Sequence, residues 1–68
     1  MQLGICTRWN PKLRIGIILA AEGNFFLQEN EILSGWPTVG CDVVFEASKR
    51  NPMPGKMPEA LNVKVLPK

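Results

Sequence analysis

The run from Ile15 to Leu19 carries hydrophobic side chains at both odd and even positions, with Gly16 as its only break. Side chains of a β-strand point alternately to the two faces of a sheet. A chain of 68 residues has material for one core, so only one face of its sheet packs inside. The second apolar row of this run is therefore expected on the surface, where contiguous apolar side chains mark interaction sites.

Turn-forming residues divide the rest of the chain into segments of strand length. Asn10-Pro11, Gly23-Asn24 and the Pro-rich stretch 51–55 are turn or loop signals. Five segments rich in β-branched or aromatic residues remain, at positions 2–9, 15–20, 24–28, 42–48 and 59–66. Only residues 29–33 have the spacing of a helical turn. The pattern predicts an all-β chain with a single domain over residues 1–68, a small five-stranded antiparallel barrel that is closed or nearly closed.

Alternation assigns faces to most of these strands. In the third strand Phe25 and Leu27 share one face, and Phe26 and Gln28 share the other. The first strand is ambiguous around Trp9, so Trp9 and Phe26 each have an alternative interpretation as core residues. The predicted core consists of Cys6, Ile18, Phe25, Leu27, Val43, Phe45, Leu61 and Val63.

The titratable residues argue against catalysis. The chain has no histidine, which removes the commonest general base, proton switch and metal ligand. Thr7, Ser34 and Ser48 have no base to activate them, and the six carboxylates are scattered without a paired acid/base spacing. We predict that the protein is not an enzyme and uses no cofactor. Its net charge of +2 permits a polyanionic partner without requiring one.

The two cysteines and the longest apolar run indicate the compartment. Cys6 and Cys41 are too few for a disulfide framework and lack the paired spacing of a zinc site, so both are predicted to be reduced thiols in or near the core. The run from Ile15 to Ala21 is far shorter than the ~20 residues that cross a bilayer. We therefore expect no membrane association and a cytoplasmic location.

The order of motifs along nearly the whole chain resembles a cold-shock domain. The segment GICTRWN from Gly4 is similar to the family's opening Gly-x-Val-Lys-Trp-Phe-Asn, and LRIGII from Leu13 falls on its first ribonucleoprotein motif, Lys-Gly-Phe-Gly-Phe-Ile. The segment FFLQE from Phe25 falls on the second motif, Val-Phe-Val-His-Phe, with Ile32 at the Ile that follows. The later segments GCDVVF from Gly40 and ALNV from Ala60 are similar to Gly-x-x-Val-x-Phe and Ala-x-Asn-Val.

This resemblance implies an oligonucleotide/oligosaccharide-binding (OB) barrel that binds single-stranded RNA or DNA through outward aromatics. The structural positions agree with the family, whereas the stacking positions mostly do not. Arg8 replaces a Trp, and Trp9 replaces a Phe. Ile15 and Ile17 replace the two Phe of the first motif, Gln28 replaces the His, and Glu29 replaces the last Phe, while Phe26 is retained. Stacking contributes about 1–3 kcal/mol per base, so binding is expected to be weaker or altered.

Two function classes follow. The first is single-stranded nucleic-acid binding, with stacking, apolar or phosphate-contacting roles for Arg8, Trp9, Lys12, Arg14, Ile15, Ile17, Phe26, Gln28 and Trp36. Lys49, Arg50 and Lys56 are further candidates for phosphate contacts from the loop before the last strand. The alternative is a protein-interaction or homodimerisation module that uses Ile15, Ile17 and Phe26 as an apolar docking patch. Glu29 argues against tight nucleic-acid binding, because its carboxylate repels phosphate.

Overall fold

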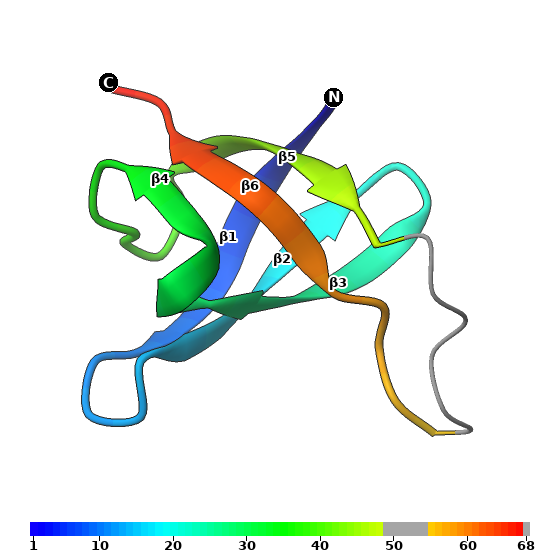
Figure 1. Cartoon of the computed structure of the whole chain (residues 1–68), viewed down its shortest axis with the longest axis horizontal. Coiled ribbons are helices and arrows are strands. Elements are labelled where there is room, and N and C mark those ends of the chain that lie inside the picture. Colours follow the sequence, from blue (N-terminus) through cyan, green and yellow to red (C-terminus); the bar gives the residue numbers. More distant parts are fainter. Residues whose placement is uncertain (49–54, 68) are drawn as a thin grey trace.

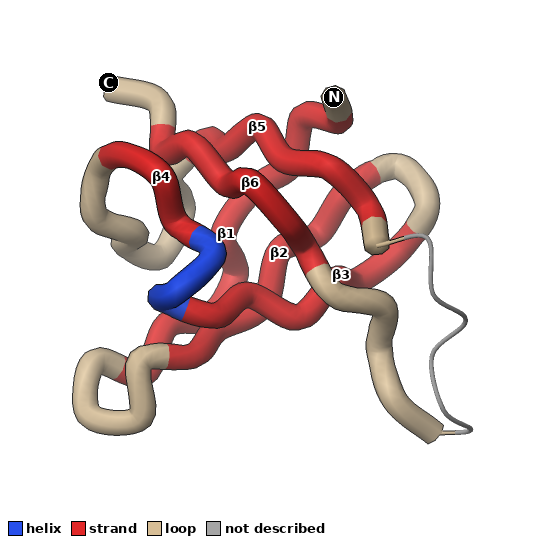
Figure 2. The backbone as a smooth tube through the Cα atoms, in the orientation of Figure 1, coloured by secondary structure: helices blue, strands red, loops and turns tan. Residues whose placement is uncertain are grey.

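The computed structural model describes residues 1–48 and 55–67, and the described chain forms six β-strands and one short 3-10 helix (Figures 1 and 2). In chain order these are β1 (Gln2–Asn10), β2 (Ile15–Ala20), β3 (Gly23–Gln28), η1 (Glu29–Glu31), β4 (Ile32–Ser34), β5 (Asp42–Ala47) and β6 (Ala60–Val65). The five predicted strands are all present, with each end within one residue of its expected position. The helical part of the described chain has neither the length nor the apolarity of a bilayer span.

The strands form one mixed sheet in the order β3-β2-β1-β5-β6-β4, in which every neighbouring pair is antiparallel except β4 and β6, which run parallel. The sheet curls into a half-barrel, as the wrapped strands of Figure 1 show. The all-β prediction is confirmed, but the prediction of a closed or nearly closed barrel of five antiparallel strands is wrong. The helical turn expected at residues 29–33 is present as η1, but the end of that segment belongs to a sixth strand, β4, which is too short to display a period.

Within residues 1–48 and 55–67, a single isolated β-bridge joins the two sides of the half-barrel. Phe26 of β3 bridges Glu59 in parallel, and the Phe26 amide donates to the Pro58 carbonyl at 2.8 Å. Pro58 has no N–H to extend this pairing into a ladder. The sheet therefore remains open at this seam.

The core lies on the concave side of the sheet. Seven of the eight predicted core residues are buried: Cys6, Ile18, Phe25, Leu27, Val43, Phe45 and Val63. The rings of Phe25 and Phe45 pack with their centroids 4.9 Å apart. Cys41 and Ala60 are buried with them.

The placement of Leu61 in the core is wrong, since its side chain is only partly buried. Asn62 has a left-handed backbone with φ 50°, and the pairing of β5 with β6 shifts register between Val44 and Glu46. The strict alternation assumed for β6 fails at this point. Ala60 and Val63, three residues apart, consequently both face the core.

A β-bulge explains why the first strand is ambiguous by pattern. Cys6 pairs with Ile18 and Arg8 pairs with Ile17, which leaves Thr7 as an extra residue that donates its Oγ1 hydrogen to the Ile17 carbonyl at 3.3 Å. Such a bulge exchanges the faces of the residues after it. Cys6 therefore faces inward before the bulge, whereas Arg8 faces outward after it.

The two cysteines meet where the connection after β4 returns to β1. The Cys6 amide donates to the Cys41 carbonyl at 2.9 Å, and the Gly40 amide donates to the Cys6 carbonyl at 2.7 Å. Gly40 adopts φ 92°, which a side chain would disfavour. Both thiols are free and buried, as predicted. Burial, with Cys41 close by, raises the pKa of the Cys6 thiol to about 11.

Candidate functional site

The convex face of β1, β2 and β3 presents a row of outward side chains. Arg8 is paired across the strands with Ile17, and Ile17 is paired with Phe26. The next row joins Ile15 to Gln28. The five side chains come together on one surface, as predicted, because the bulge at Thr7 turns Arg8 to the side on which Ile17 and Phe26 already lie.

These residues form part of an open groove of about 500 Å³, which we call the main groove. Its lining comprises Thr7, Arg8, Trp9, Asn10, Ile15, Gly16, Ile17, Phe26, Val39 and Met57. Apolar side chains dominate this lining, with one guanidinium group at Arg8. The groove therefore offers flat apolar contact and one cationic contact to a ligand.

Phe26 occupies the boundary between the main groove and a second one. The second, which we call the side groove, has a volume of about 480 Å³ and is lined by Phe26, Gln28, Gly55, Lys56, Met57 and Glu59. Phe26 is half-buried, in contrast to its neighbour Phe25, which is 3% exposed. The predicted opposite faces of these two residues are confirmed, and Phe26 and Met57 are shared by both grooves.

Val39 and Met57 are groove residues that the sequence interpretation missed. Both lie outside the strands, Val39 in the connection before β5 and Met57 in the segment before β6. Strand alternation assigns no face to such residues. Their contribution depends on how the half-barrel brings separate loops to the edge of the β1–β3 face.

Trp9 lies on the other side of the sheet from Arg8. It pairs with Gly16, packs against the core and contacts Trp36 edge to face, with ring centroids 5.5 Å apart and planes at 84°. A Cβ at Gly16 would lie 2.9 Å from the Trp9 ring, so the ring covers this glycine closely. Trp9 is also among the residues that line the main groove, and its ring packs against Trp36.

Trp36 is 54% exposed, yet it does not line the main groove. It lines a separate hollow with Thr38, Cys41 and Val65. The two tryptophans predicted to stack on bases are thus paired with each other, while Phe26 is the aromatic of the convex face that borders both grooves.

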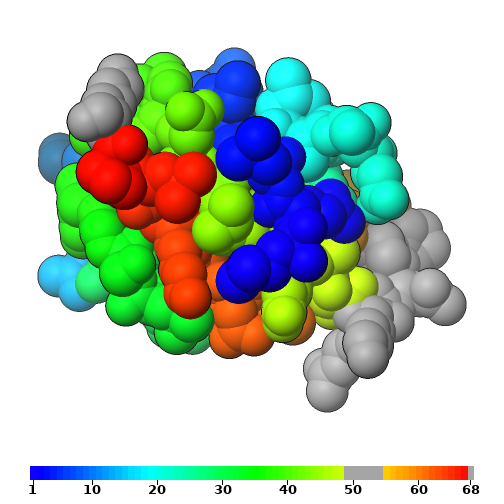
Figure 3. Space-filling view, turned by 90° about the horizontal axis from the view of Figure 1, so that it is seen from above, coloured from blue at the N-terminus to red at the C-terminus, as the bar shows by residue number. Residues whose placement is uncertain are grey.

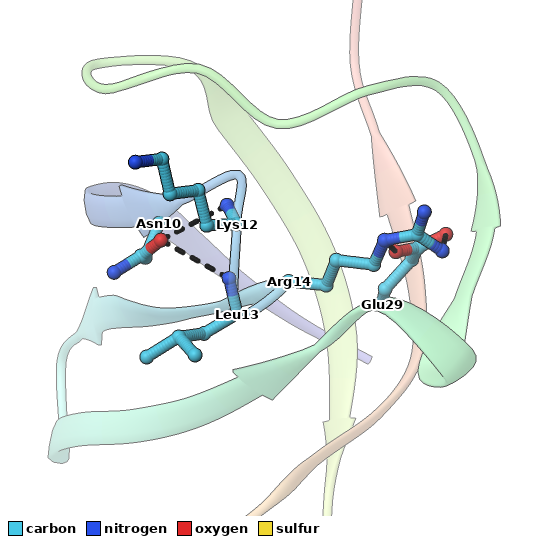
Figure 4. A network of polar contacts seen from close by, with 5 residues as sticks. All are labelled: Asn10, Lys12, Leu13, Arg14 and Glu29. Atoms are coloured by element: carbon cyan, nitrogen blue, oxygen red, sulfur yellow. Dashed lines mark hydrogen bonds and ion pairs between the residues drawn. The ribbon is translucent and has the colours of Figure 1, made fainter.

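The loop between β1 and β2 carries the predicted phosphate contacts, Lys12 and Arg14. Its shape is fixed by Asn10, whose Oδ1 accepts hydrogen bonds from the amides of Lys12 at 3.0 Å and Leu13 at 3.1 Å (Figure 4). The Arg14 amide donates to the Asn10 carbonyl at 2.7 Å, and Arg14 takes the left-handed conformation with φ 59°. Asn10 therefore holds both cations at one end of the convex face.

Arg14 is paired with Glu29 of η1, as Figure 4 shows. Its Nε lies 3.1 Å from Glu29 Oε2, and its Nη1 donates to Oε1 at 3.4 Å. The backbones are joined as well, since the Glu29 amide donates to the Arg14 carbonyl at 3.0 Å. The two groups border a hollow of about 390 Å³, the corner hollow, together with Leu13, Ile15, Gln28 and Asn30.

The remaining charged candidates are distributed around the side groove. Lys56 and the oppositely charged Glu59 both line it. Lys49 and Arg50 lie outside the described residues. Across residues 1–48 and 55–67, no group of three or more His, Cys, Asp or Glu side chains has the arrangement of a metal site. The described charges around these grooves are of mixed sign.

No protein-family model matches this chain, and no curated protein matches it.

Proposed function

We propose that this protein binds single-stranded nucleic acid on the convex face of β1, β2 and β3, as a divergent cold-shock-like domain of the OB type. The observation that carries the proposal is the row Arg8, Ile17 and Phe26, which crosses three strands at the main groove. Aromatic and guanidinium planes stack on bases whatever the sequence. The aliphatic side chains extend this row with apolar contact.

The topology supports the OB-type assignment. A meander of β3, β2 and β1 continues through β5 to β6, and a parallel bridge relates β3 to the residue before β6. The OB fold is a five-stranded, partly open barrel whose strand face binds oligonucleotides. In this interpretation β4 is an addition that pairs with the outer edge of β6.

The positions of the cationic side chains support a path for a single nucleic-acid strand along this face. Arg8 lies within it, Lys12 and Arg14 lie at the β1–β2 loop, and Lys56 borders the side groove. Phosphate contacts from Lys and Arg position a strand while the bases occupy the apolar surface. A single strand, whose bases are unpaired, can make both kinds of contact at once.

The lost aromatics set the expected affinity. Relative to the family that the chain resembles, four Trp or Phe stacking positions are now Arg8, Ile15, Ile17 and Glu29. At about 1–3 kcal/mol for each base stack, four losses amount to about 4–12 kcal/mol if nothing replaces them. Partial replacement by Arg8 and by apolar contact leads us to expect micromolar binding, on the order of −8 kcal/mol.

The test is fluorescence anisotropy of a labelled octanucleotide of deoxythymidine or uridine, titrated with the protein at two salt concentrations. We expect saturable binding whose log–log dependence on salt has a slope of about −1 to −3, from about −0.7 for each phosphate neutralised. A Leu33→Ala variant, changed at an exposed apolar residue of β4, is the matched control and should bind like the parent. Absence of saturable binding at low salt would refute the proposal.

An exposed apolar surface favours one alternative, a protein-interaction or homodimerisation module. Leu3 pairs across the strands with Val44, and Ile5 with Leu19, so these side chains extend the apolar row of Ile15 and Ile17 beyond the main groove. Figure 3 shows the start of the chain lying between the β2–β3 turn and the C-terminal segment on this side of the molecule. A dimer in sedimentation, together with no oligonucleotide binding, would favour this alternative.

A further inference from the structure

We propose that the Arg14 guanidinium is a phosphate-binding site whose ligand position is held in the free protein by the Glu29 carboxylate. The inference rests on the proposed function, because the phosphate belongs to the bound strand. In the family that the chain resembles, an aromatic residue stands at the position of Glu29. In this protein that position has become an internal anion that competes with the ligand.

The geometry of the ion pair supports exchange. Glu29 Oε2 lies 3.1 Å from Arg14 Nε, yet it is shielded from solvent and has no hydrogen bond of acceptable geometry among the described residues. The other contact, from Nη1 to Oε1, is long at 3.4 Å. Arginine binds anions best through two short, parallel hydrogen bonds. The carboxylate of Glu29 does not provide that arrangement.

Because both side chains are accessible to solvent, replacing the Glu29 carboxylate by a phosphate at Arg14 costs little free energy. Arg14 is 67% exposed and Glu29 is 34% exposed. Exposed ion pairs contribute little to stability, because water screens them and because ordering two long side chains costs entropy. A phosphate that approaches Arg14 from solvent meets an accessible guanidinium group and a weakly held competitor.

The location connects this site to the proposed strand path. The corner hollow beside the pair shares Ile15 with the main groove and Gln28 with the side groove. A strand whose bases lie on Ile17 and Phe26 therefore passes its backbone within reach of Arg14. Because Glu29 lies beside Arg14, its negative charge weakens the binding of the nucleic-acid strand and reduces the salt dependence of the affinity.

The experiment compares the parent with Glu29→Gln, which removes the negative charge and keeps the size of the side chain. One further phosphate contact corresponds to a change of about −0.7 in the log–log salt slope. If the two proteins bind equally at 1 M salt, this difference in slope makes Glu29→Gln bind about fivefold more tightly than the parent at 0.1 M salt and less than about twofold more tightly at 0.5 M. We therefore expect Glu29→Gln to bind the labelled octanucleotide more tightly, by an amount that fades as salt rises.

Glu31→Gln is the matched control. Glu31 belongs to the same 3-10 helix and its loss changes the net charge equally, but its Oε1 accepts from the Asn62 amide at 3.5 Å and not from Arg14. The control should gain clearly less than Glu29→Gln. In the double variant Arg14→Ala with Glu29→Gln, the gain should disappear.

The outcomes separate the two proposals. If the parent binds and Glu29→Gln gains no more than Glu31→Gln, the competing-anion site is wrong and the proposed function stands. If neither the parent nor Glu29→Gln binds the octanucleotide, both are wrong. A second readout in the unaltered protein is the Arg14 Nε–H resonance, which should shift as the octanucleotide is added. An unchanged resonance at saturation would overturn the site even if Glu29→Gln failed to fold.

Discussion

Adjacent phenylalanines in β3 provide a direct test of which side chain supports folding and which supports binding. Phe25 is 3% exposed and packs against Phe45, whereas Phe26 is half-buried and borders two grooves. Replacement of each by alanine removes the same atoms from neighbouring positions of one strand. The two variants should therefore fail in opposite assays.

The stability change follows from burial. Truncation of a buried phenylalanine costs about 3–5 kcal/mol. A domain of 68 residues is stabilised by about 3–10 kcal/mol in total, at 0.05–0.15 kcal/mol per residue. Phe25→Ala should accordingly lower the melting temperature by about 12–40 °C, at about 4–8 °C for each kcal/mol. The Phe26 side chain buries less surface than that of Phe25, so Phe26→Ala should lower the free energy of unfolding by about 1 kcal/mol and the melting temperature by about 4–8 °C.

The binding change follows from stacking. Loss of one base–aromatic contact weakens binding by about 1–3 kcal/mol, which is about 5-fold to 150-fold in the dissociation constant. Phe26→Ala should show this loss in the octanucleotide titration. Phe26→Leu, which keeps an apolar side chain but has no aromatic face, should melt near the parent and still lose affinity.

The assays are thermal unfolding by circular dichroism and anisotropy titration on the same preparations. If Phe26→Ala unfolds as severely as Phe25→Ala, the assignment of faces in β3 is wrong. If Phe26→Ala is folded and binds as tightly as the parent, the stacking mechanism is wrong.

Three further predictions concern the loop, the close approach at β2 and the thiols. In the Glu29→Gln background, where the competing carboxylate is absent, Arg14→Ala should weaken binding to all sequences alike and make the salt slope shallower by about 0.7. Titration at several salt concentrations measures this slope, and an unchanged slope would exclude a phosphate contact. Gly16→Ala should lower the melting temperature by more than about 10 °C, because its Cβ would overlap the Arg8 carbonyl oxygen, and a parent-like melt would contradict this packing. The pKa of the Cys6 thiol is raised from the ordinary 9.0 to about 11 in the folded state, so the protonated thiol favours folding below pH 9 and this effect is lost as the pH rises toward 11. The free energy of unfolding should therefore fall by about 1.4 kcal/mol per pH unit over that interval. Chemical denaturation at several pH values should show a smaller fall in Cys6→Ala.

Local signals in the sequence are strong enough to predict five of the six described strands and most of the core. Phe25 and Leu27 alternate with Phe26 and Gln28, and the structure confirms the two faces. Turn residues such as Pro11 and Gly23 fix the strand ends closely. Burial of apolar rows and the chemistry of tight turns are local properties, so a single sequence carries them.

The features that sequence missed depend on backbone irregularities and long-range pairing. The bulge at Thr7 and the left-handed Asn62 each interrupt an alternation that pattern analysis assumes to be strict. The strand β4 is defined by its pairing with β6, which lies about thirty residues later in the chain. Pattern analysis has no means of detecting such partners.

Some features of the candidate site could likewise be predicted from the sequence, and others could not. The outward positions of Ile17 and Phe26 follow from motif and alternation together, whereas that of Arg8 follows from the motif alone and depends on the bulge at Thr7. The turning of Trp9 toward Trp36 depends on the bulge, and the approach of Met57 depends on how the half-barrel folds. The pairing of Arg14 with Glu29 joins residues fifteen positions apart across the β1–β2 loop and η1.

The most direct test of the central claim is a titration of the isotopically labelled protein with an unlabelled octanucleotide, followed by amide and side-chain NMR. The account predicts that progressive shifts concentrate on Arg8, Ile17 and Phe26 and on the loop that carries Arg14, while Leu33 of β4 stays unchanged. Shifts confined to Leu33 or to residues away from β1–β3, or no shifts at low salt, would contradict the claim that this convex face binds single-stranded nucleic acid.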